Sequence, residues 1–165
     1  MTAWTWTLAA LGAGVLGWIG PQVIARLPAS PDADPETASY RDIADVPRLS
    51  VWLAAGAVAL VTIVSLGVPD HLIPAWVVVC GAGMWLAYID WRTNLLPTRI
   101  VWPTYAVTVA VVGIEAWAMA DVKILMRGMV ASAIAFAVFW LVWWVAGLWR
   151  PGSFGFGDVR LAAPL

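Results

Sequence analysis

Five stretches of the chain are long and apolar enough to cross a lipid bilayer, and they limit the possible fold more than any other feature. The hydrocarbon core of a bilayer is about 30 Å thick and requires about 20 apolar residues for each helical span. The five stretches contain one charged residue, Glu115, and cover residues 3–25, 49–69, 72–89, 100–120 and 129–149. We therefore expect an all-α polytopic membrane protein with about five transmembrane helices, forming one integral membrane domain over residues 1–165.

The composition agrees with a membrane location and argues against other classes of protein. Of the 165 residues, 62% are hydrophobic and only 12% are charged, so the chain has more apolar surface than a soluble core of this size could bury. The chain opens with "MTAWTWT", which has no basic residue, and the first apolar stretch is too long for a cleavable signal peptide. The formal net charge of −1 gives no support for a nucleic-acid partner. The expected surroundings are a lipid bilayer.

The distribution of lysine and arginine predicts how the helices cross the membrane, because cytoplasmic loops retain positive charge. The first, third and fifth segments after a span hold seven of the nine basic residues, namely Arg26, Arg41, Arg48, Arg92, Arg99, Arg150 and Arg160. This pattern predicts an N terminus outside the cell and a cytoplasmic loop over residues 26–48.

The loop over residues 26–48 is the only soluble-looking part of the chain. It is rich in Pro, Asp, Ala and Ser, which is typical of an extended loop, with room for a short surface helix. It contains five acidic residues against three arginines, a net charge of −2. A solvated loop explains this composition, and an acidic surface that attracts a basic peptide is the alternative.

One apparent motif is better explained by packing. The sequence "GAGVLG" at residues 12–17 fits the dinucleotide fingerprint G-x-G-x-x-G. That fingerprint requires a strand before it and a helix after it, whereas here it lies in the middle of an apolar span. We interpret Gly12, Gly14, Gly17 and Gly20 as a surface that lets another helix approach closely.

Other residues that often carry chemistry also have structural interpretations here. The single cysteine, Cys80, excludes an intramolecular disulfide and a thiolate metal cage, and we interpret it as a small buried packing residue. Glu115 lies about one turn from the outer end of its span and is interpreted as structural. His71 is expected in a short turn. Tryptophans near span ends are interpreted as interfacial anchors, among them Trp4, Trp6, Trp91, Trp102 and Trp117.

Two aspartates remain as functional candidates. Asp90 ends the third apolar stretch in "YIDWRTNLLPTRIVWP", and Asp158 follows the fifth in "GFGDVRLAA". Two whole spans separate them, so both must face the same side of the membrane. Gly155 and Gly157 let the backbone before Asp158 approach a bound strand closely. The alternatives are a snorkelling or capping role for Asp90 and a helix N-cap role for Asp158.

A pair of carboxylates at one membrane face is suited to peptide hydrolysis. Two carboxyl groups held close together in a partly desolvated site cannot both ionise easily, so one keeps a proton while the other is charged. The charged group takes a proton from the attacking water, and the protonated group polarises the scissile carbonyl and then protonates the leaving amine. The coupled pair titrates as a unit, so the roles of the two acids are not assigned individually.

The two motifs resemble those of the type IV prepilin peptidases, which are GxGD-type membrane aspartic proteases. The resemblance rests on "IDWRTNLLPTRIVWP" at residues 89–103 and "GFGDVRLAA" at residues 155–163. It implies that Asp90 and Asp158 are the catalytic dyad, with no cofactor and no metal. It also implies a prepilin-like substrate, with a short basic leader before a hydrophobic helix, that is cut at the cytoplasmic face of the plasma membrane.

The chain also departs from the larger members of that family. Those proteins carry a cysteine-rich insert after the first span and methylate the new N terminus, whereas residues 26–48 contain no cysteine. Methyl transfer is therefore not expected. Relatives continue past the glycine motif into at least one further span, so the resemblance leads us to expect a further helix after residue 165 and a truncated C terminus.

Two other functions are compatible with the same residues. Presenilin-like intramembrane proteases also pair a GxGD motif with an aspartate close to a tyrosine, as in "YID", but their acids lie deep within spans. A non-enzymatic membrane scaffold or transport subunit could use the two acids only to cap helices. Replacement of Asp90 or Asp158 by Asn separates a dyad, which tolerates neither change, from a scaffold, which tolerates both.

Overall fold

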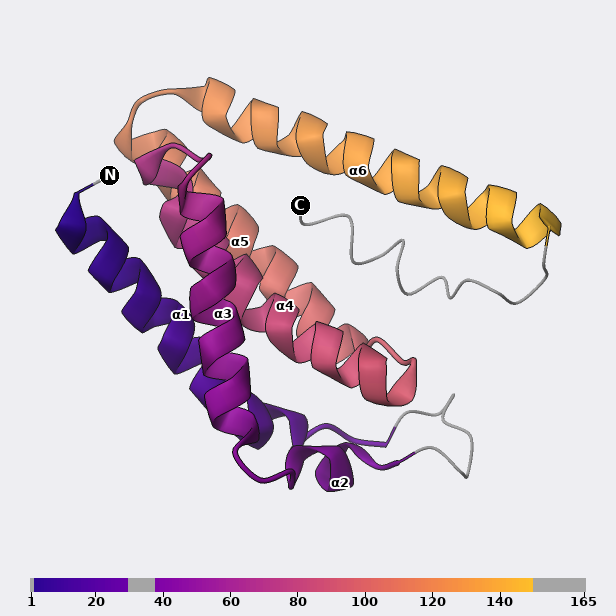
Figure 1. Cartoon of the computed structure of the whole chain (residues 1–165). Helices are drawn as coiled ribbons and strands as arrows, with labels where there is room; N and C mark the ends of the chain where they lie inside the picture. The colour runs from indigo at the N-terminus through magenta and orange to yellow at the C-terminus, as the bar shows by residue number, and fades with distance from the viewer. Residues whose placement is uncertain (1, 30–37, 150–165) are drawn as a thin grey trace. The chain divides into compact units, whose positions relative to one another are not determined.

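The protein is all-helical over the residues that its computed structural model describes, 2–29 and 38–149. In chain order the elements are α1 (Ala3–Ile24), α2 (Tyr40–Ala44), α3 (Leu49–Ser65), the short 3-10 helix η1 (Asp70–Leu72), α4 (Ile73–Thr93), α5 (Thr98–Ala118) and α6 (Val122–Trp149) (Figure 1). Within the described ranges there is no strand. The predicted fold class, an all-α polytopic membrane protein, is confirmed.

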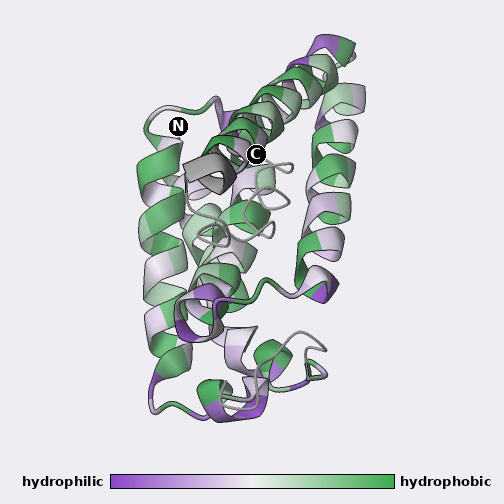
Figure 2. Cartoon of the chain, turned by 90° about the vertical axis from the view of Figure 1, so that its right-hand side faces the viewer, coloured by the Kyte–Doolittle hydropathy of each residue, from purple (hydrophilic) through white to green (hydrophobic). Residues whose placement is uncertain are grey.

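Each predicted span coincides with a long helix. In the described part of the chain, three segments are long and apolar enough to cross a membrane: α1, η1 together with α4 (Asp70–Thr93), and α5. Helix α3 is apolar but shorter, with 17 residues, and α6 covers the fifth predicted stretch. Figure 2 shows that hydrophobic residues dominate the long helices, whereas hydrophilic residues gather at helix ends and on α2.

Two helix boundaries differ from the expected spans for local reasons. Helix α3 ends at Ser65 rather than at residue 69, because Gly67 and Pro69 follow it and neither favours a continuing helix. Helix α6 starts at Val122, several residues before the apolar stretch itself. The Asp121 carboxylate accepts the Lys123 N–H at 2.9 Å and so caps the first turn.

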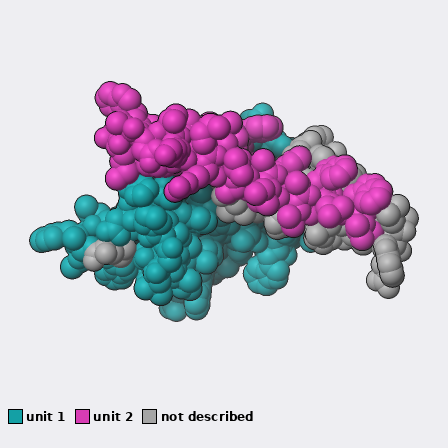
Figure 3. All heavy atoms as spheres, turned by 90° about the horizontal axis from the view of Figure 1, so that it is seen from above, with its two compact units in different colours: residues 1–100 teal, residues 101–165 magenta. Residues whose placement is uncertain are grey.

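The chain divides into two compact units, residues 1–100 and residues 101–165 (Figure 3). The first unit contains α1 to α4, and within it α1 packs against both α3 and α4, while α3 also packs against α4. The second unit contains most of α5 and all of α6, which are joined by a short turn. The expectation of a single domain over residues 1–165 stays a prediction.

Glycines allow the helices of the first unit to approach closely. A Cβ added to Gly17 would lie 2.5 Å from the Ala54 Cα on α3, and one added to Gly20 would lie 2.7 Å from Leu53 and from the Trp85 ring. The interpretation of "GAGVLG" and Gly20 as a helix-packing surface is therefore confirmed, and the segment lies inside α1 with no strand before it. Close backbone contact of this kind holds helices together in lipid, where the hydrophobic effect does not.

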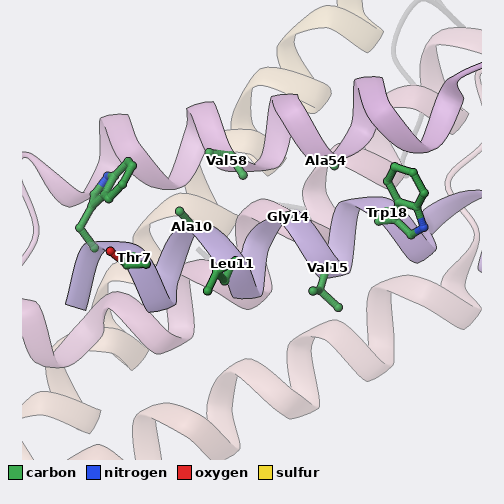
Figure 4. A pocket seen from close by; sticks show the side chains of 9 residues that line it. Thr7, Ala10, Leu11, Gly14, Val15, Trp18, Ala54 and Val58 are labelled. Carbon is green, nitrogen blue, oxygen red and sulfur yellow. The ribbon is translucent and has the colours of Figure 1, made fainter. Parts of the chain in front are cut away.

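On the surface of the first unit, α1 and α3 form an apolar groove. Figure 4 shows residues of both helices that line it, among them Gly14 and Trp18 on α1 and Ala54 and Val58 on α3. Trp18 is 54% exposed. A surface of this composition is suited to contact with lipid rather than with water.

Candidate active site at the end of helix α4

Asp90 lies in the last turn of α4, three residues before the helix ends at Thr93. Its side chain is half-buried, whereas Trp91 and Arg92, which follow it, are exposed. Among the described residues no group donates a hydrogen bond to the Asp90 carboxylate. The structure therefore places this acid at the boundary between a packed helix and the surroundings.

A backbone cap fixes the end of α4 just after Asp90. Asn94 has a left-handed conformation with φ 51°, and its N–H donates to the Asp90 carbonyl at 2.7 Å. Asparagine tolerates this conformation better than most residues other than glycine. The Thr93 hydroxyl donates to the Ile89 carbonyl at 2.8 Å and accepts the Leu95 N–H at 3.3 Å. The hydrogen bonds of Thr93 and Asn94 thus fix the direction in which the chain leaves α4 before α5 begins.

A buried stripe holds the second half of α4 against the rest of the first unit. The stripe consists of residues at helical spacing that are all buried: Ala82, Trp85, Leu86, Ile89 and Thr93. At its centre, the Trp85 indole N–H donates to the Leu16 carbonyl on α1 at 3.1 Å. Because each residue turns an α-helix by about 100°, Asp90 lies at one edge of this stripe, next to Ile89.

The other edge of the stripe carries Tyr88, which connects α4 to the first loop. The Tyr88 hydroxyl donates to the Ile43 carbonyl on α2 at 2.6 Å. Ile43 is fully buried and Tyr40, one turn earlier on α2, is 7% exposed. The loop between α1 and α3 is therefore packed at the same end of the unit as Asp90. The expected short helix in this loop is confirmed as α2.

The N terminus of α2 is stabilised by its own capping box. The Ser39 hydroxyl accepts the Asp42 N–H at 3.2 Å, and the Asp42 carboxylate accepts the Ser39 N–H at 3.3 Å. This reciprocal pair satisfies donors that a helix N terminus would otherwise leave unpaired. The Asp42 carboxylate thus has a structural role within the predicted acidic loop.

Aromatic and basic side chains surround the exposed end of α4. The Trp91 ring lies 6.3 Å from the Tyr88 ring, and the Arg92 guanidinium lies 5.8 Å from the centre of the Trp91 ring. Trp91 is 75% exposed, as expected for an interfacial tryptophan. These contacts place an aromatic ring and a cation at the exposed end of α4.

The second predicted acid, Asp158, lies outside the described residues, so its prediction as the partner of Asp90 stays a prediction. The other residues considered above have the expected structural settings. Cys80 is buried in the core of the first unit at 5% exposure, and His71 lies in the short helix η1. Glu115 lies in the last turn of α5. Within the described ranges, His, Cys, Asp and Glu side chains form no group of three that could bind a metal ion.

The sequence alone does not indicate that the Tyr88 and Trp85 side chains hold the end of α4. The sequence does contain a pattern that predicts the short helix to which Tyr88 binds. The segment "SYRDI" at residues 39–43 combines the Ser-x-x-Asp spacing of a capping box with two apolar residues three apart, which is typical of a short amphipathic turn. The partner of that turn on α4 is 45 residues away in the sequence and leaves no local pattern.

The fold and this helix end define a multi-pass α-helical membrane protein with a carboxylate in the last turn of a span. The sequence matches the model of the Type IV leader peptidase family over residues 77–165, more than half of the chain. The chain belongs to this family, and the match includes both Asp90 and Asp158. Comparison with curated proteins and with solved structures gives no match.

Proposed function

We propose that the protein is a membrane aspartic endopeptidase that removes the short leader of type IV prepilin-like proteins, with Asp90 and Asp158 as the catalytic pair. The observation that carries this proposal is the family match over residues 77–165, which supports a leader peptidase and contains both acids. The setting of Asp90, half-buried in the last turn of α4, is compatible with this chemistry.

In the proposed reaction, the two carboxyl groups share one proton. The ionised group accepts a proton from water as the water oxygen attacks the carbonyl carbon of the scissile peptide bond. The protonated group donates a hydrogen bond to the carbonyl oxygen, which becomes negatively charged in the transition state. As the intermediate collapses, the C–N bond breaks and the leaving amine takes up a proton. No cofactor takes part in these steps.

The position of the loop that contains α2 supports a cut at the cytoplasmic side of the membrane. That loop contributes Arg26, Arg41 and Arg48 to the basic residues, and its helix α2 is bound by Tyr88 at the end of α4 that carries Asp90. Since positively charged loops stay in the cytoplasm, we propose that the active site faces the cytoplasm at the plasma membrane. A substrate with a basic leader and a hydrophobic helix would then present its cleavage site at this face.

Replacement of either aspartate by asparagine tests the proposal. Asn nearly preserves the shape of Asp but cannot take part in the proton transfers, so Asp90→Asn and Asp158→Asn should each slow leader removal roughly 10²- to 10⁴-fold. The measurement is the loss of the leader from a co-expressed prepilin-like protein, followed by the change in its gel mobility. Unchanged cleavage by either variant would contradict the proposed dyad and favour a scaffold.

Asp121→Asn provides the matched control. Asp121 is exposed and its carboxylate caps α6, a role that asparagine can also fill. This variant should cut the substrate at the wild-type rate. A metal chelator should leave cleavage by the wild-type protein unchanged, and loss of activity on chelation would also contradict a mechanism based on two carboxylates alone.

A further inference from the structure

Tyr88 connects α2 to the helix that carries Asp90. Its hydroxyl donates to the Ile43 carbonyl on α2 at 2.6 Å, and its ring belongs to the helix that carries Asp90. The two α4 residues are separated along the helix axis by only about 3 Å. Helix α2 is therefore held at the same end of α4 as the acid.

The positions of Tyr88 and Asp90 on α4 allow the Tyr88 hydroxyl to be removed without a change in the position of Asp90. Each residue turns the helix by about 100°, so Tyr88 and Asp90 lie on opposite edges of the buried stripe that contains Ile89. The backbone at Asp90 is held independently, by the Asn94 N–H and by the packing of Ile89, which is fully buried. Removal of the Tyr88 hydroxyl would weaken the attachment of α2 to α4 without displacing the acid.

Helix α2 packs against both α1 and α4. It is five residues long, far shorter than a helix that is stable by itself in water, and it buries two side chains, Tyr40 and Ile43. Its exposed side chains are Arg41 and Asp42. The hydrogen bond from Tyr88 is one of the contacts that hold this short helix against α4.

From these contacts we infer that Tyr88 is a positioning residue for the peptidase reaction, because it docks α2 as one wall of the surface that binds the substrate leader. The inference rests on the proposed function. An extended peptide advances about 3.3 Å per residue, so about four residues on the leader side of the cut reach across a helix about 10 Å wide, from Asp90 to α2. A leader longer than this contacts α2, and a shorter one does not.

The test is the variant Tyr88→Phe, which removes only the hydroxyl. If α2 is docked for a smaller fraction of the time, the apparent affinity for the leader falls by that fraction, so the KM for a substrate with a complete leader should rise roughly 2- to 10-fold. The kcat should stay at the wild-type value, because the position of Asp90 is unchanged. With a substrate whose leader is cut back to two residues, wild-type and variant proteins should have the same KM.

Tyr105→Phe is the matched control. Tyr105 is half-buried on α5 with its ring edge-on to Trp102 at 6.3 Å, and among the described residues its hydroxyl has no hydrogen-bond partner. This variant makes the same chemical change and should leave KM and kcat unchanged. A general loss of stability in Tyr88→Phe would lower the amount of active protein and the apparent kcat, but not raise KM.

Hydrogen exchange of the full-length protein in detergent gives a second measurement that does not depend on cleavage. In Tyr88→Phe the backbone amides of α2 should exchange several-fold faster than in the wild type, while those of α1 and α4 stay protected. Unchanged α2 exchange, an unchanged KM, or a lower kcat at constant KM would each overturn the inference. A wild-type protein that removes no leader would instead refute the proposed function, and α2 exchange would still decide whether Tyr88 docks α2.

Discussion

Asn94 determines where α4 stops and therefore where the chain turns after Asp90. Its φ of 51° lies in the left-handed region, where a β-branched side chain is strained by about 1–2 kcal/mol. We expect Asn94→Val to lower the free energy of unfolding by about that amount, whereas Asn94→Gly should change it by only a few tenths of a kcal/mol, because glycine accepts positive φ without strain. Thermal unfolding in detergent measures both. Equal stability of Asn94→Val and the wild type would contradict a left-handed cap.

At the same scale, the sequence was sufficient to locate Asp90 but not its surroundings. A charged residue directly after a long apolar run can be recognised from the sequence alone, because the run itself indicates the membrane-spanning helix. The bond from Tyr88 to Ile43 joins residues 45 positions apart, and that from Trp85 to Leu16 joins residues 69 apart. Such contacts depend on how α1, α2 and α4 pack, which no local pattern encodes.

At the scale of helices, the packing of α1 against α3 depends on Gly17. An added Cβ would lie 2.5 Å from the Ala54 Cα and from the Leu53 carbonyl oxygen, so the backbone of α3 would have to move. Gly17→Ala should therefore lower the free energy of unfolding by about 1–3 kcal/mol. The measurement is thermal or denaturant unfolding of the purified protein in one detergent.

Gly83→Ala is the control for this substitution. Gly83 also lies inside a helix, α4, but nothing lies within 4 Å of the position that its Cβ would take. Alanine is favoured over glycine in a helix, so this variant should keep or raise the free energy of unfolding, by up to about 1 kcal/mol. If both substitutions had the same effect, close contact between α1 and α3 would not be the reason for glycine at residue 17.

The glycine spacing of α1 was enough to predict a helix-packing face, but not which helices occupy it. In the structure Gly17 faces α3, Gly20 faces both α3 and α4, and Gly12 lies near Val77 on α4. Helix α1 thus packs against two helices. The turns that join the helices determine which of them lie next to α1. Helix ends were likewise missed where a cap rather than hydropathy defines them, as at Asp121 before α6.

At the scale of the whole molecule, the family match and the packed unit overlap only in part. The match starts at Val77, inside α4, whereas α1, α2 and α3 precede it. These earlier elements provide the contacts that hold the end of α4, through Leu16, Ile43 and the glycine face of α1. The part of the chain outside the family match therefore supports the candidate site within it.

The proposed direction of the chain through the membrane can be tested with single cysteines. Two positions are suitable in a Cys80→Ala background: Asp45, exposed at the end of α2, and Gly67, exposed in the turn after α3 with no atom within 4 Å of an added Cβ. If the loop that contains Arg41 is cytoplasmic, a membrane-impermeant maleimide should label Gly67→Cys in intact cells. It should label Asp45→Cys only after the membrane is opened.

The two labelling positions also test whether α3 crosses the bilayer. At 1.5 Å per residue, its 17 residues span about 25 Å, slightly less than a hydrocarbon core of about 30 Å. A short span is accommodated by local thinning of the bilayer at modest cost, so we expect the two cysteines on opposite sides. Labelling of both from the same side would show that α3 does not cross. The reverse pattern would place Asp90 outside the cell, and the proposed cytoplasmic cut would then be wrong.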